Sequence, residues 1–422
     1  MGLTPAPARD PGADTGRQNP HLTHRANIGA GRHGWLRLTP AYSVRLVRDR
    51  LAAVPAGSVI TDPFSGSGTT VLAAAEHGCA GQALDVNPFL VWLGNAKARD
   101  YHPDLLAQVR QELPRITEQA RKQAGDALRL WEPRLHNIGR WWAPGPLAAL
   151  KALRHVLDEA DLPQPGLDLL SIAFCRAAIE SSNAAFNHQS MSFRAAGTPA
   201  AAFWLEEGAV IDGFAAHAGL VLAAAAVPLP GTGRVLAGDA RQPAAGLPPC
   251  DLLITSPPYV NRMSYIRELR PYMYWLRFLQ HGSEAGELDW QAIGGTWGAA
   301  TSRVAGWVPD GTVLPVGPEL AAATALIRRD GGRNGPLLAN YVAKYFYDMA
   351  RHFEAAFTLV RSGGEVIYVI GNSTFYGHLI PAQDWYAALL RAAGFTGVAV
   401  APLRKRNSKA ALYEYEVTAT RP

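Results

Sequence analysis

The residues best suited to chemistry in this chain are Ser256-Pro257-Pro258-Tyr259, which directly follow the apolar run 251–255 (DLLIT). Two consecutive prolines cannot continue a sheet, because each lacks a backbone N–H and has a fixed φ. The chain therefore leaves the predicted strand in a stiff loop, and such a loop at the carboxyl end of a strand suits a binding site. Ser256 Oγ and the Pro257 carbonyl offer hydrogen-bond acceptors in fixed positions, and Tyr259 offers an aromatic ring.

A second group of residues, 62–70 (DPFSGSGTT), has the pattern of a nucleoside-binding loop. Gly66 and Gly68 let the backbone turn sharply and approach a ligand, and the predicted helix after them points its first N–H groups into the turn. Asp85 follows about 20 residues further on, which is the spacing of a ribose-hydroxyl acceptor. The loop lacks the Gly-Lys-Ser/Thr of a P-loop, so a nucleoside without phosphates fits better than ATP. S-adenosylmethionine is the commonest such cofactor.

Taken together, DPFSGSGTT and TSPPY resemble the S-adenosylmethionine-dependent amino-methyltransferases of DNA, at pattern level over roughly residues 30–95 and 233–420. Those enzymes methylate the exocyclic amine of cytosine or adenine. Serine before Pro-Pro is more typical of cytosine-N4 enzymes, and aspartate of adenine-N6 enzymes. The resemblance therefore implies methyl transfer to N4 of a flipped cytosine at a catalytic loop of Ser256, Pro257, Pro258 and Tyr259, with adenine-N6 transfer as the alternative.

The cofactor residues are read from the loop pattern and, further along the chain, from the resemblance. The resemblance implies that Asp239 contacts the adenine part, that Asn87 shapes its rim, and that the segment around Pro40, Tyr42 and Ser43 packs over the methionine end. The expected cofactor-binding set is Asp62, Pro63, Phe64, Gly66, Gly68, Thr69, Thr70, Asp85, Asn87, Asp239, Pro40, Tyr42 and Ser43.

The elements that position these residues form a βαβ unit and its continuation. Strands are expected at 58–64, 81–87, 233–241, 251–255, 364–372 and in the last 25 residues, with helices at 35–51, near 70–78, 341–360 and 384–394. We therefore expect an α/β fold, a Rossmann-like methyltransferase sheet with helices on both faces, plus an inserted and mainly helical domain.

The expected organisation has six segments. A disordered tail (1–25) precedes the first part of the methyltransferase domain (26–99), and an Ala- and Leu-rich helical insertion (100–230) is broken at Pro114, Pro133, Pro144 and Pro163. The domain resumes with the SPPY loop (231–281), is interrupted by an irregular stretch (282–335), and ends with residues 336–422. Either insertion could read the target, and 181–194 carries candidate polar and aromatic residues for this.

The net charge of +5 permits a nucleic-acid partner without requiring one. Basic side chains beside aromatics, and a basic loop near the end of the chain, are the expected phosphate contacts. The expected DNA-binding residues are Arg262, Arg267, Arg404, Lys405 and Arg406. Double-stranded DNA is the expected partner, and a cognate restriction endonuclease acting on the same site would suit such an enzyme.

Other functional classes are less favoured by the sequence. We find no apolar run of membrane-spanning length and no signal peptide, so a cytoplasmic, bacterial and nucleoid-associated protein is expected. Three cysteines without a CxxC pair indicate neither a disulfide framework nor a metal site. Pro249-Cys250 resembles the nucleophile of carbon-5 cytosine methyltransferases, but Cys250 stands at the wrong end of its strand, about 17 Å from SPPY.

Two alternatives to a DNA enzyme stay open. An RNA methyltransferase acting on tRNA or rRNA amines would share the cofactor fold and a related Pro-Pro-Tyr loop, although no familiar RNA-binding module is recognisable. A degenerate, non-catalytic nucleic-acid-binding subunit is disfavoured by the intact Asp85, Gly66, Gly68 and SPPY.

Overall fold

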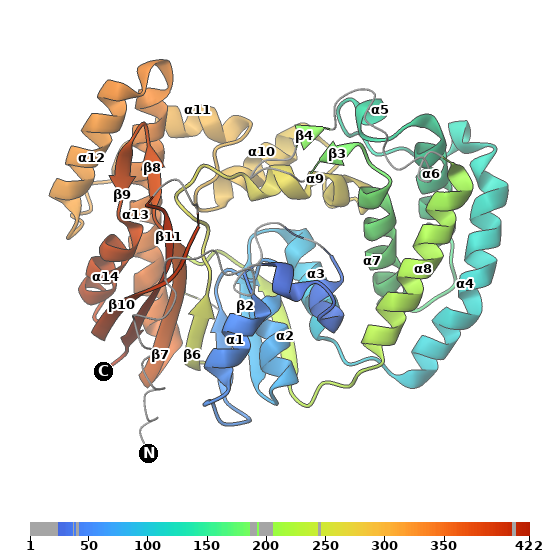
Figure 1. The fold of residues 1–422 in the computed structure, drawn as a ribbon, viewed down its shortest axis with the longest axis horizontal. Coiled ribbons are helices and arrows are strands. Elements are labelled where there is room, and N and C mark those ends of the chain that lie inside the picture. Colours follow the sequence, from blue (N-terminus) through green and yellow to red (C-terminus); the bar gives the residue numbers. More distant parts are fainter. Residues whose placement is uncertain are drawn as a thin grey trace.

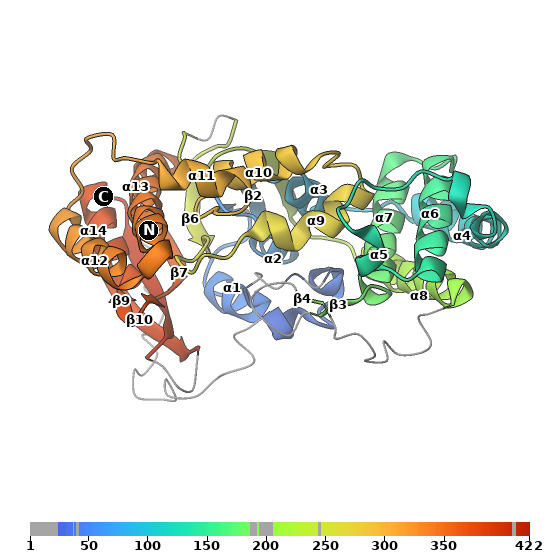
Figure 2. The ribbon, with the colours of Figure 1, turned by 90° about the horizontal axis from the view of Figure 1, so that it is seen from above.

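The computed structural model describes residues 24–36, 38, 42–185, 192–193, 206–243, 246–406 and 411–422. Residues 1–23 of the predicted disordered tail, and Pro40, lie outside these residues, whereas residues 24 and 25, the end of that tail, are part of a short turn. The molecule is elongated, with a helical bundle at one end and the carboxyl-terminal part of the chain at the other (Figures 1 and 2).

A seven-stranded sheet in the order β10-β11-β7-β6-β1-β2-β5 forms the centre of the molecule (Figure 1). Neighbours from β5 to β7 are parallel, whereas β11 runs antiparallel to both β7 and β10. The strands are β1 (Val59–Asp62), β2 (Ala80–Asp85), β5 (Thr232–Ala237), β6 (Cys250–Thr255), β7 (Val360–Gly371), β10 (Thr396–Lys405) and β11 (Tyr413–Thr420). This topology confirms the predicted Rossmann-like α/β sheet.

The strand order reverses between β1 and β6. From β1 the chain adds β2 and β5 on one side, and it then returns to add β6 and β7 on the other. In open parallel sheets, ligands bind at the carboxyl ends of the strands at such a reversal. The ends of β1 and β6 are therefore the place where a site is expected.

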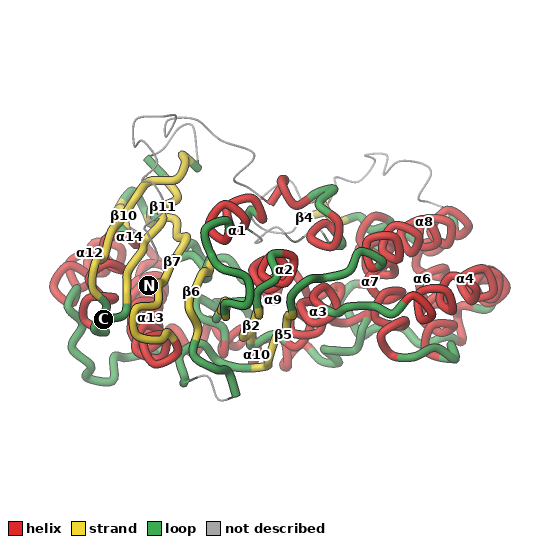
Figure 3. Tube along the Cα trace, turned by 90° about the horizontal axis from the view of Figure 1, so that it is seen from below, coloured by secondary structure: helices red, strands yellow, loops and turns green. Residues whose placement is uncertain are grey.

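Helices cover both faces of the sheet, as the alternating side chains of β6 show. Leu252 and Ile254 pack with α1 (Val44–Leu51) and α2 (Thr69–Glu76), whereas Leu253 faces the core under α13 (Gly335–Leu359) and α14 (Ala382–Ala392). Figure 3 shows β6 and β7 between α1 and α13. All six residues of β6 are buried, which explains the unbroken apolar run in the sequence.

The predicted helical insertion forms the bundle at one end of the molecule (Figure 1). Its core is continuous with α3 (Pro88–Ala98) and α9 (Tyr265–Trp275), so the insertion is fused to the sheet domain. Its helices are α4 (Pro103–Ala124), α5 (Ile138–Trp141), α6 (Pro144–Asp158), α7 (Gln164–Glu180) and α8 (Glu207–Ala225). Contrary to the sequence expectation, α8 is long and apolar enough to cross a membrane by length and composition alone, although half of it is buried in the bundle.

Three expectations about elements were wrong. The stretch 282–335 contains helices α10 (Gly282–Gln291), α11 (Ala299–Ala305) and α12 (Gly317–Asp330), which are short and bury few residues each, so their periodicity is weak. Pro114 lies inside α4 at an exposed position, where water can solvate the carbonyl that proline leaves unpaired. The helix expected from residue 35 begins only at Val44, after the short turn η3 (Gly31–Gly34).

Small elements complete the fold. They are the hairpins β3 (Ala184–Ala185) with β4 (Ser192–Phe193) and β8 (Ser373–Phe375) with β9 (His378–Ile380), and the short turns η2 (His24–Asn27), η4 (Ala127–Arg129) and η6 (Gly332–Asn334).

Candidate functional site

The two sequence motifs meet at the reversal of the sheet. Asp62 is the last residue of β1 and Thr255 the last of β6, and these strands are neighbours. Thr255 Oγ1 donates a hydrogen bond of 2.5 Å to Asp62 Oδ1. Because Ser256 follows Thr255 directly, this bond fixes the start of the SPPY loop against the start of the DPFSGSGTT loop.

Asp62 is the centre of a buried network. Its carboxylate also accepts hydrogen bonds from Thr70 Oγ1 at 2.6 Å and from the Phe64 N–H at 3.0 Å, and the Tyr42 hydroxyl reaches Thr70. Burial raises the pKa of Asp62 to about 7. The predicted cofactor residues Asp62, Thr70 and Tyr42 therefore form one connected group.

The glycine loop has the backbone conformation that its sequence predicts. Gly66 and Gly68 both have positive φ, 49° and 74°, and Gly68 begins α2. A Cβ on Gly68 would lie 3.0 Å from the Gly94 Cα of α3, so both strain and contact exclude a side chain there. Lys97 Nζ donates a hydrogen bond of 2.9 Å to the Ser67 carbonyl, and burial lowers the pKa of Lys97 to about 7.

Asp85 holds this loop from the neighbouring strand. One carboxylate oxygen accepts from the Gly66 N–H and the other from the Asn87 N–H, each at 2.9 Å. Burial raises the pKa of Asp85 to about 6. Each oxygen keeps a second lone pair, so Asp85 can hold the loop and still accept hydrogen bonds from a diol.

The SPPY loop directly follows β6, and its tyrosine, Tyr259, is half-buried. The guanidinium of Arg406 lies over the Tyr259 ring, 5.2 Å from its centroid, and its Nη1 donates to the Asn372 carbonyl at 2.8 Å. Burial raises the pKa of Tyr259, and the nearby Ser256 hydroxyl opposes this rise. Tyr259 is thus a neutral ring with a cation on one face.

Gly371, the last residue of β7, makes this arrangement possible. A Cβ on Gly371 would lie 2.4 Å from Arg406 Nη1 and 3.0 Å from Tyr259 Cδ2. We expect Gly371→Ala to lower the free energy of unfolding by about 1 kcal/mol, because the Arg406 guanidinium, at the end of a flexible side chain, must move aside. The measurement is chemical denaturation in a double-mutant cycle with Arg406→Ala, where most of this cost should disappear. An equal cost in both backgrounds would show that Arg406 is not the obstacle.

Other predicted cofactor residues have structural partners of their own. Asp239 forms a bidentate ion pair with Arg241, which also binds Asp348 of α13. Ser43 caps α1 and Asn87 caps α3 through their side-chain oxygens. Their proposed contacts with a cofactor would add to these roles.

The five basic residues predicted to bind DNA come from two segments, Arg262 and Arg267 near the start of α9 and residues 404–406 at the end of β10. Arg404 is paired with Glu414 by two hydrogen bonds of 2.7 Å, and Arg406 is held on Tyr259. Lys405 is half-buried at the end of β10, Arg267 is half-buried on α9, and Arg262 is exposed. Arg404 and Arg406 are therefore occupied by protein groups, which the charge pattern alone did not reveal.

Several residues of the site were missed by the sequence reasoning. Tyr341 and Tyr345 of α13 and Tyr386 of α14 lie against the SPPY loop, and Thr255 joins it to Asp62. The i, i+4 spacing of Tyr341 and Tyr345 was a detectable signal, since it places both on one face of a helix.

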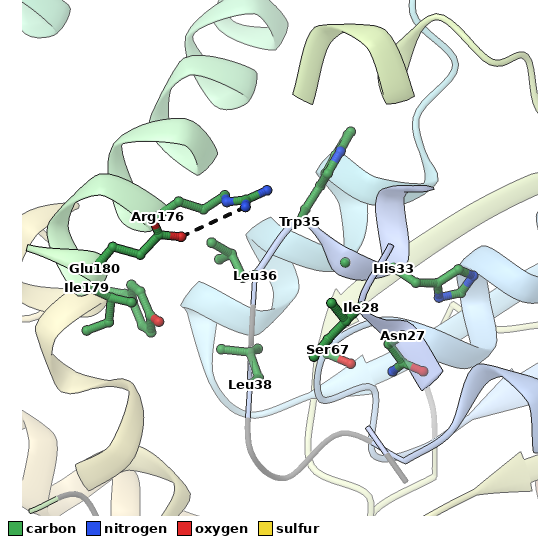
Figure 4. Close-up of a pocket in the computed structure, with 12 residues that line it drawn as sticks. Asn27, Ile28, His33, Trp35, Leu36, Leu38, Ser67, Arg176, Ile179 and Glu180 are labelled. Atoms are coloured by element: carbon green, nitrogen blue, oxygen red, sulfur yellow. Dashed lines mark ion pairs between the residues drawn. The ribbon is translucent and has the colours of Figure 1, made fainter. Parts of the chain in front are cut away.

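A cavity of about 210 Å³ lies beside the glycine loop (Figure 4). Trp35, Leu36 and Leu38 form one wall, and Arg176 and Glu180 of α7 form the other. The cavity therefore lies where the helical insertion approaches Ser67. Cys250, at the opposite end of β6 from SPPY, is buried, and burial raises its pKa to about 11, which does not suit a nucleophile.

Comparison with known proteins gives little. No protein-family model matches the chain, and no curated protein matches it. Among solved structures it is similar to an rRNA methyltransferase, AviRa from Streptomyces viridochromogenes, at 14% identity, with 95% of this chain and 96% of that chain covered and a TM-score of 0.27. We draw no conclusion from a TM-score this low.

Proposed function

We propose that this protein is an S-adenosylmethionine-dependent methyltransferase that acts on the exocyclic N4 amine of cytosine in DNA. The observation that carries the proposal is the hydrogen bond between Thr255 and Asp62, which joins the cofactor-type loop to the SPPY loop at the reversal of the sheet. A methyl donor in one loop and an amine in the other would meet within one site.

The loop chemistry suits S-adenosylmethionine better than a phosphorylated nucleotide. Asp85 offers acceptors for ribose hydroxyls, and the positive-φ glycines expose backbone to a ligand. Lys97 is buried, and its Nζ donates a hydrogen bond to the Ser67 carbonyl of the glycine loop. Its ammonium group is therefore not available to bind a phosphate. Bound there, the cofactor supplies an electrophilic methyl group; the residues of the chain bind and orient it.

The SPPY loop would prepare the amine. Among the described residues, the Tyr345 hydroxyl donates a hydrogen bond to the Pro258 carbonyl, whereas no hydrogen bond reaches the Pro257 carbonyl. Ser256 Oγ and the Pro257 oxygen would accept from the amine hydrogens, and Tyr259 would stack on the flipped base through the face opposite Arg406. Rigid acceptors need little reorganisation during the reaction.

The direct test is product identity. The protein is incubated with labelled S-adenosylmethionine and separate pools of double-stranded DNA and RNA, and the digested nucleosides are identified by mass spectrometry. N4-methylcytosine in DNA is the expected product. N6-methyladenine would preserve the mechanism and show that serine before Pro-Pro was misleading, whereas label in RNA alone would assign an RNA substrate. A bacterial, nucleoid-associated protein with a cognate endonuclease is part of the same proposal.

The proposed cofactor contact at Asp85 gives a separate prediction. Asp85→Ala removes the ribose acceptor and releases the N–H groups of Gly66 and Asn87, so the affinity for S-adenosylhomocysteine should fall at least about tenfold, the equivalent of one or two hydrogen bonds. Isothermal titration calorimetry measures the change. Asp212→Ala, on the exposed surface of α8, is the control, and unchanged affinity in the Asp85 variant would remove Asp85 from the site.

A further inference from the structure

Two tyrosines of α13 form hydrogen bonds with the turn that follows Pro257-Pro258. Tyr345 donates its hydroxyl proton to the Pro258 carbonyl at 2.7 Å, and the Tyr341 hydroxyl accepts from the Arg262 N–H at 2.9 Å. The two residues are four apart on one helix, so their Cα atoms lie about 6 Å apart along its axis and their side chains share one face. One helix face thus holds both ends of the turn that carries Tyr259.

The direction of these hydrogen bonds is determined by a third tyrosine. Tyr386 of α14 lies 2.5 Å from the Tyr345 hydroxyl. A carbonyl can only accept, so Tyr345 must give its single proton to Pro258 and receive the proton of Tyr386. Tyr341, Tyr345 and Tyr386 are buried, and burial raises the pKa of each, so all three hydroxyls stay protonated at neutral pH.

Two further main-chain groups of the turn, both of Tyr259, are also hydrogen-bonded. The Tyr259 carbonyl accepts from the Asn261 N–H at 2.8 Å, and the Tyr259 N–H points to the Tyr265 hydroxyl of α9 at 3.4 Å. Arg262 has the left-handed backbone conformation, φ 61°, which is uncommon for a residue with a side chain. External hydrogen bonds therefore stabilise a turn that its own sequence does not favour.

We propose that Tyr341 and Tyr345 are positioning residues, which aim Tyr259 and the Pro257 carbonyl by fixing the Pro258 carbonyl and the Arg262 amide. Phenylalanine would fill the same core volume, so packing does not require the hydroxyls. The effect on catalysis rests on the proposed methyl transfer, whereas the effect on the turn does not.

The test compares Tyr341→Phe, Tyr345→Phe and the double variant with Tyr368→Phe. Tyr368 is a matched control, because it is buried in the same core and its hydroxyl donates to His352 Nε2, away from the turn. Hydrogen–deuterium exchange of peptides spanning residues 259–264 reports on the turn without any substrate. The Arg262 amide is hydrogen-bonded to the Tyr341 hydroxyl, so exchange there should accelerate about tenfold in Tyr341→Phe.

Methyl transfer provides the second readout. Tyr345→Phe should lower kcat about tenfold and leave the KM for S-adenosylmethionine unchanged, and the double variant should lower kcat further. Tyr368→Phe should leave both constants unchanged, even where its melting temperature falls as much as that of Tyr345→Phe.

Unchanged exchange in the Tyr341 variant would overturn the inference, whatever the activity. Faster exchange with an unchanged kcat would also overturn it, because the turn would then not aim the reacting groups. A wild-type protein that transfers no methyl group would refute the proposed function instead, and the exchange measurement would still decide whether the tyrosines hold the turn.

Discussion

Tyr259→Ala is expected to reduce kcat for methyl transfer by up to about a hundredfold while leaving the affinity for S-adenosylhomocysteine within about twofold. Stacking of one base on an aromatic ring contributes about 1–3 kcal/mol, and each 1.4 kcal/mol corresponds to about a factor of ten. Alanine also removes the surface on which Arg406 rests, 5.2 Å from the ring centroid, so this cation would lose its place. The Asp62 and Asp85 contacts of the glycine loop do not involve Tyr259, which is why cofactor affinity should persist.

Single-turnover rates with a saturating cofactor, together with calorimetric titration, measure the two quantities separately. Tyr259→Phe keeps the ring and should keep most of the rate, whereas Tyr376→Ala, at an exposed tyrosine of the β8–β9 hairpin, should change neither rate nor affinity. A parallel loss of rate and cofactor affinity in Tyr259→Ala would contradict the stacking role and place this ring in the cofactor site.

The sheet and the two loops could be predicted because their signals are local. Pro257 and Pro258 end β6 by covalent geometry, and the glycines at 66 and 68 are required by a positive φ that the structure shows. The buried β6 and the helix after Gly68 follow from short apolar runs that are continuous in the chain. The carboxyl ends of neighbouring parallel strands then bring both loops together without any information from distant segments.

The surroundings of the site could not be predicted because they depend on contacts between distant residues. Arg404 is predicted from charge alone to contact phosphate, but its pairing with Glu414 on the next strand depends on the fold. Tyr345 is almost ninety residues from the Pro258 carbonyl that it binds, and single-sequence patterns carry no such pairing. The helices within 282–335 bury few apolar residues each, so their periodicity was too weak to detect.

Substitution of Asp62 should have the second large effect, on the free energy of unfolding, because three hydrogen-bond donors converge on this one buried carboxylate. In Asp62→Ala the hydroxyls of Thr70 and Thr255 and the Phe64 N–H lose their acceptor. An unsatisfied buried donor costs about 1–3 kcal/mol, and the two hydroxyls can rotate, so we expect the free energy of unfolding to fall by about 3 kcal/mol. Asp62→Asn keeps an acceptor oxygen and the side-chain shape, and should remain within about 1 kcal/mol of the wild type at pH 7.

The pH dependence of stability distinguishes the charge of Asp62 from its shape. Burial raises its pKa to about 7 in the folded state, above the ordinary value of 3.8, so the folded protein binds a proton that the unfolded chain has released. The stability due to this proton is present at low pH and is lost as the pH rises to about 7. Asp85, with a folded pKa of about 6, contributes in the same direction at lower pH. Relative to the wild type, Asp62→Asn should therefore gain stability as the pH rises from 5 to 8.

Binding of the cationic cofactor should show the opposite trend. S-adenosylmethionine carries a positive sulfonium, which favours the ionised form of a nearby carboxylate. Wild-type affinity should therefore rise between pH 7 and 8, where Asp85 is already mostly ionised, and this rise should be absent in Asp62→Asn. Calorimetric titration across this range measures it. The same slope in both proteins would show that the buried carboxylate only ties Thr255 to Thr70, and that the charge of the cofactor is balanced by other groups of the site.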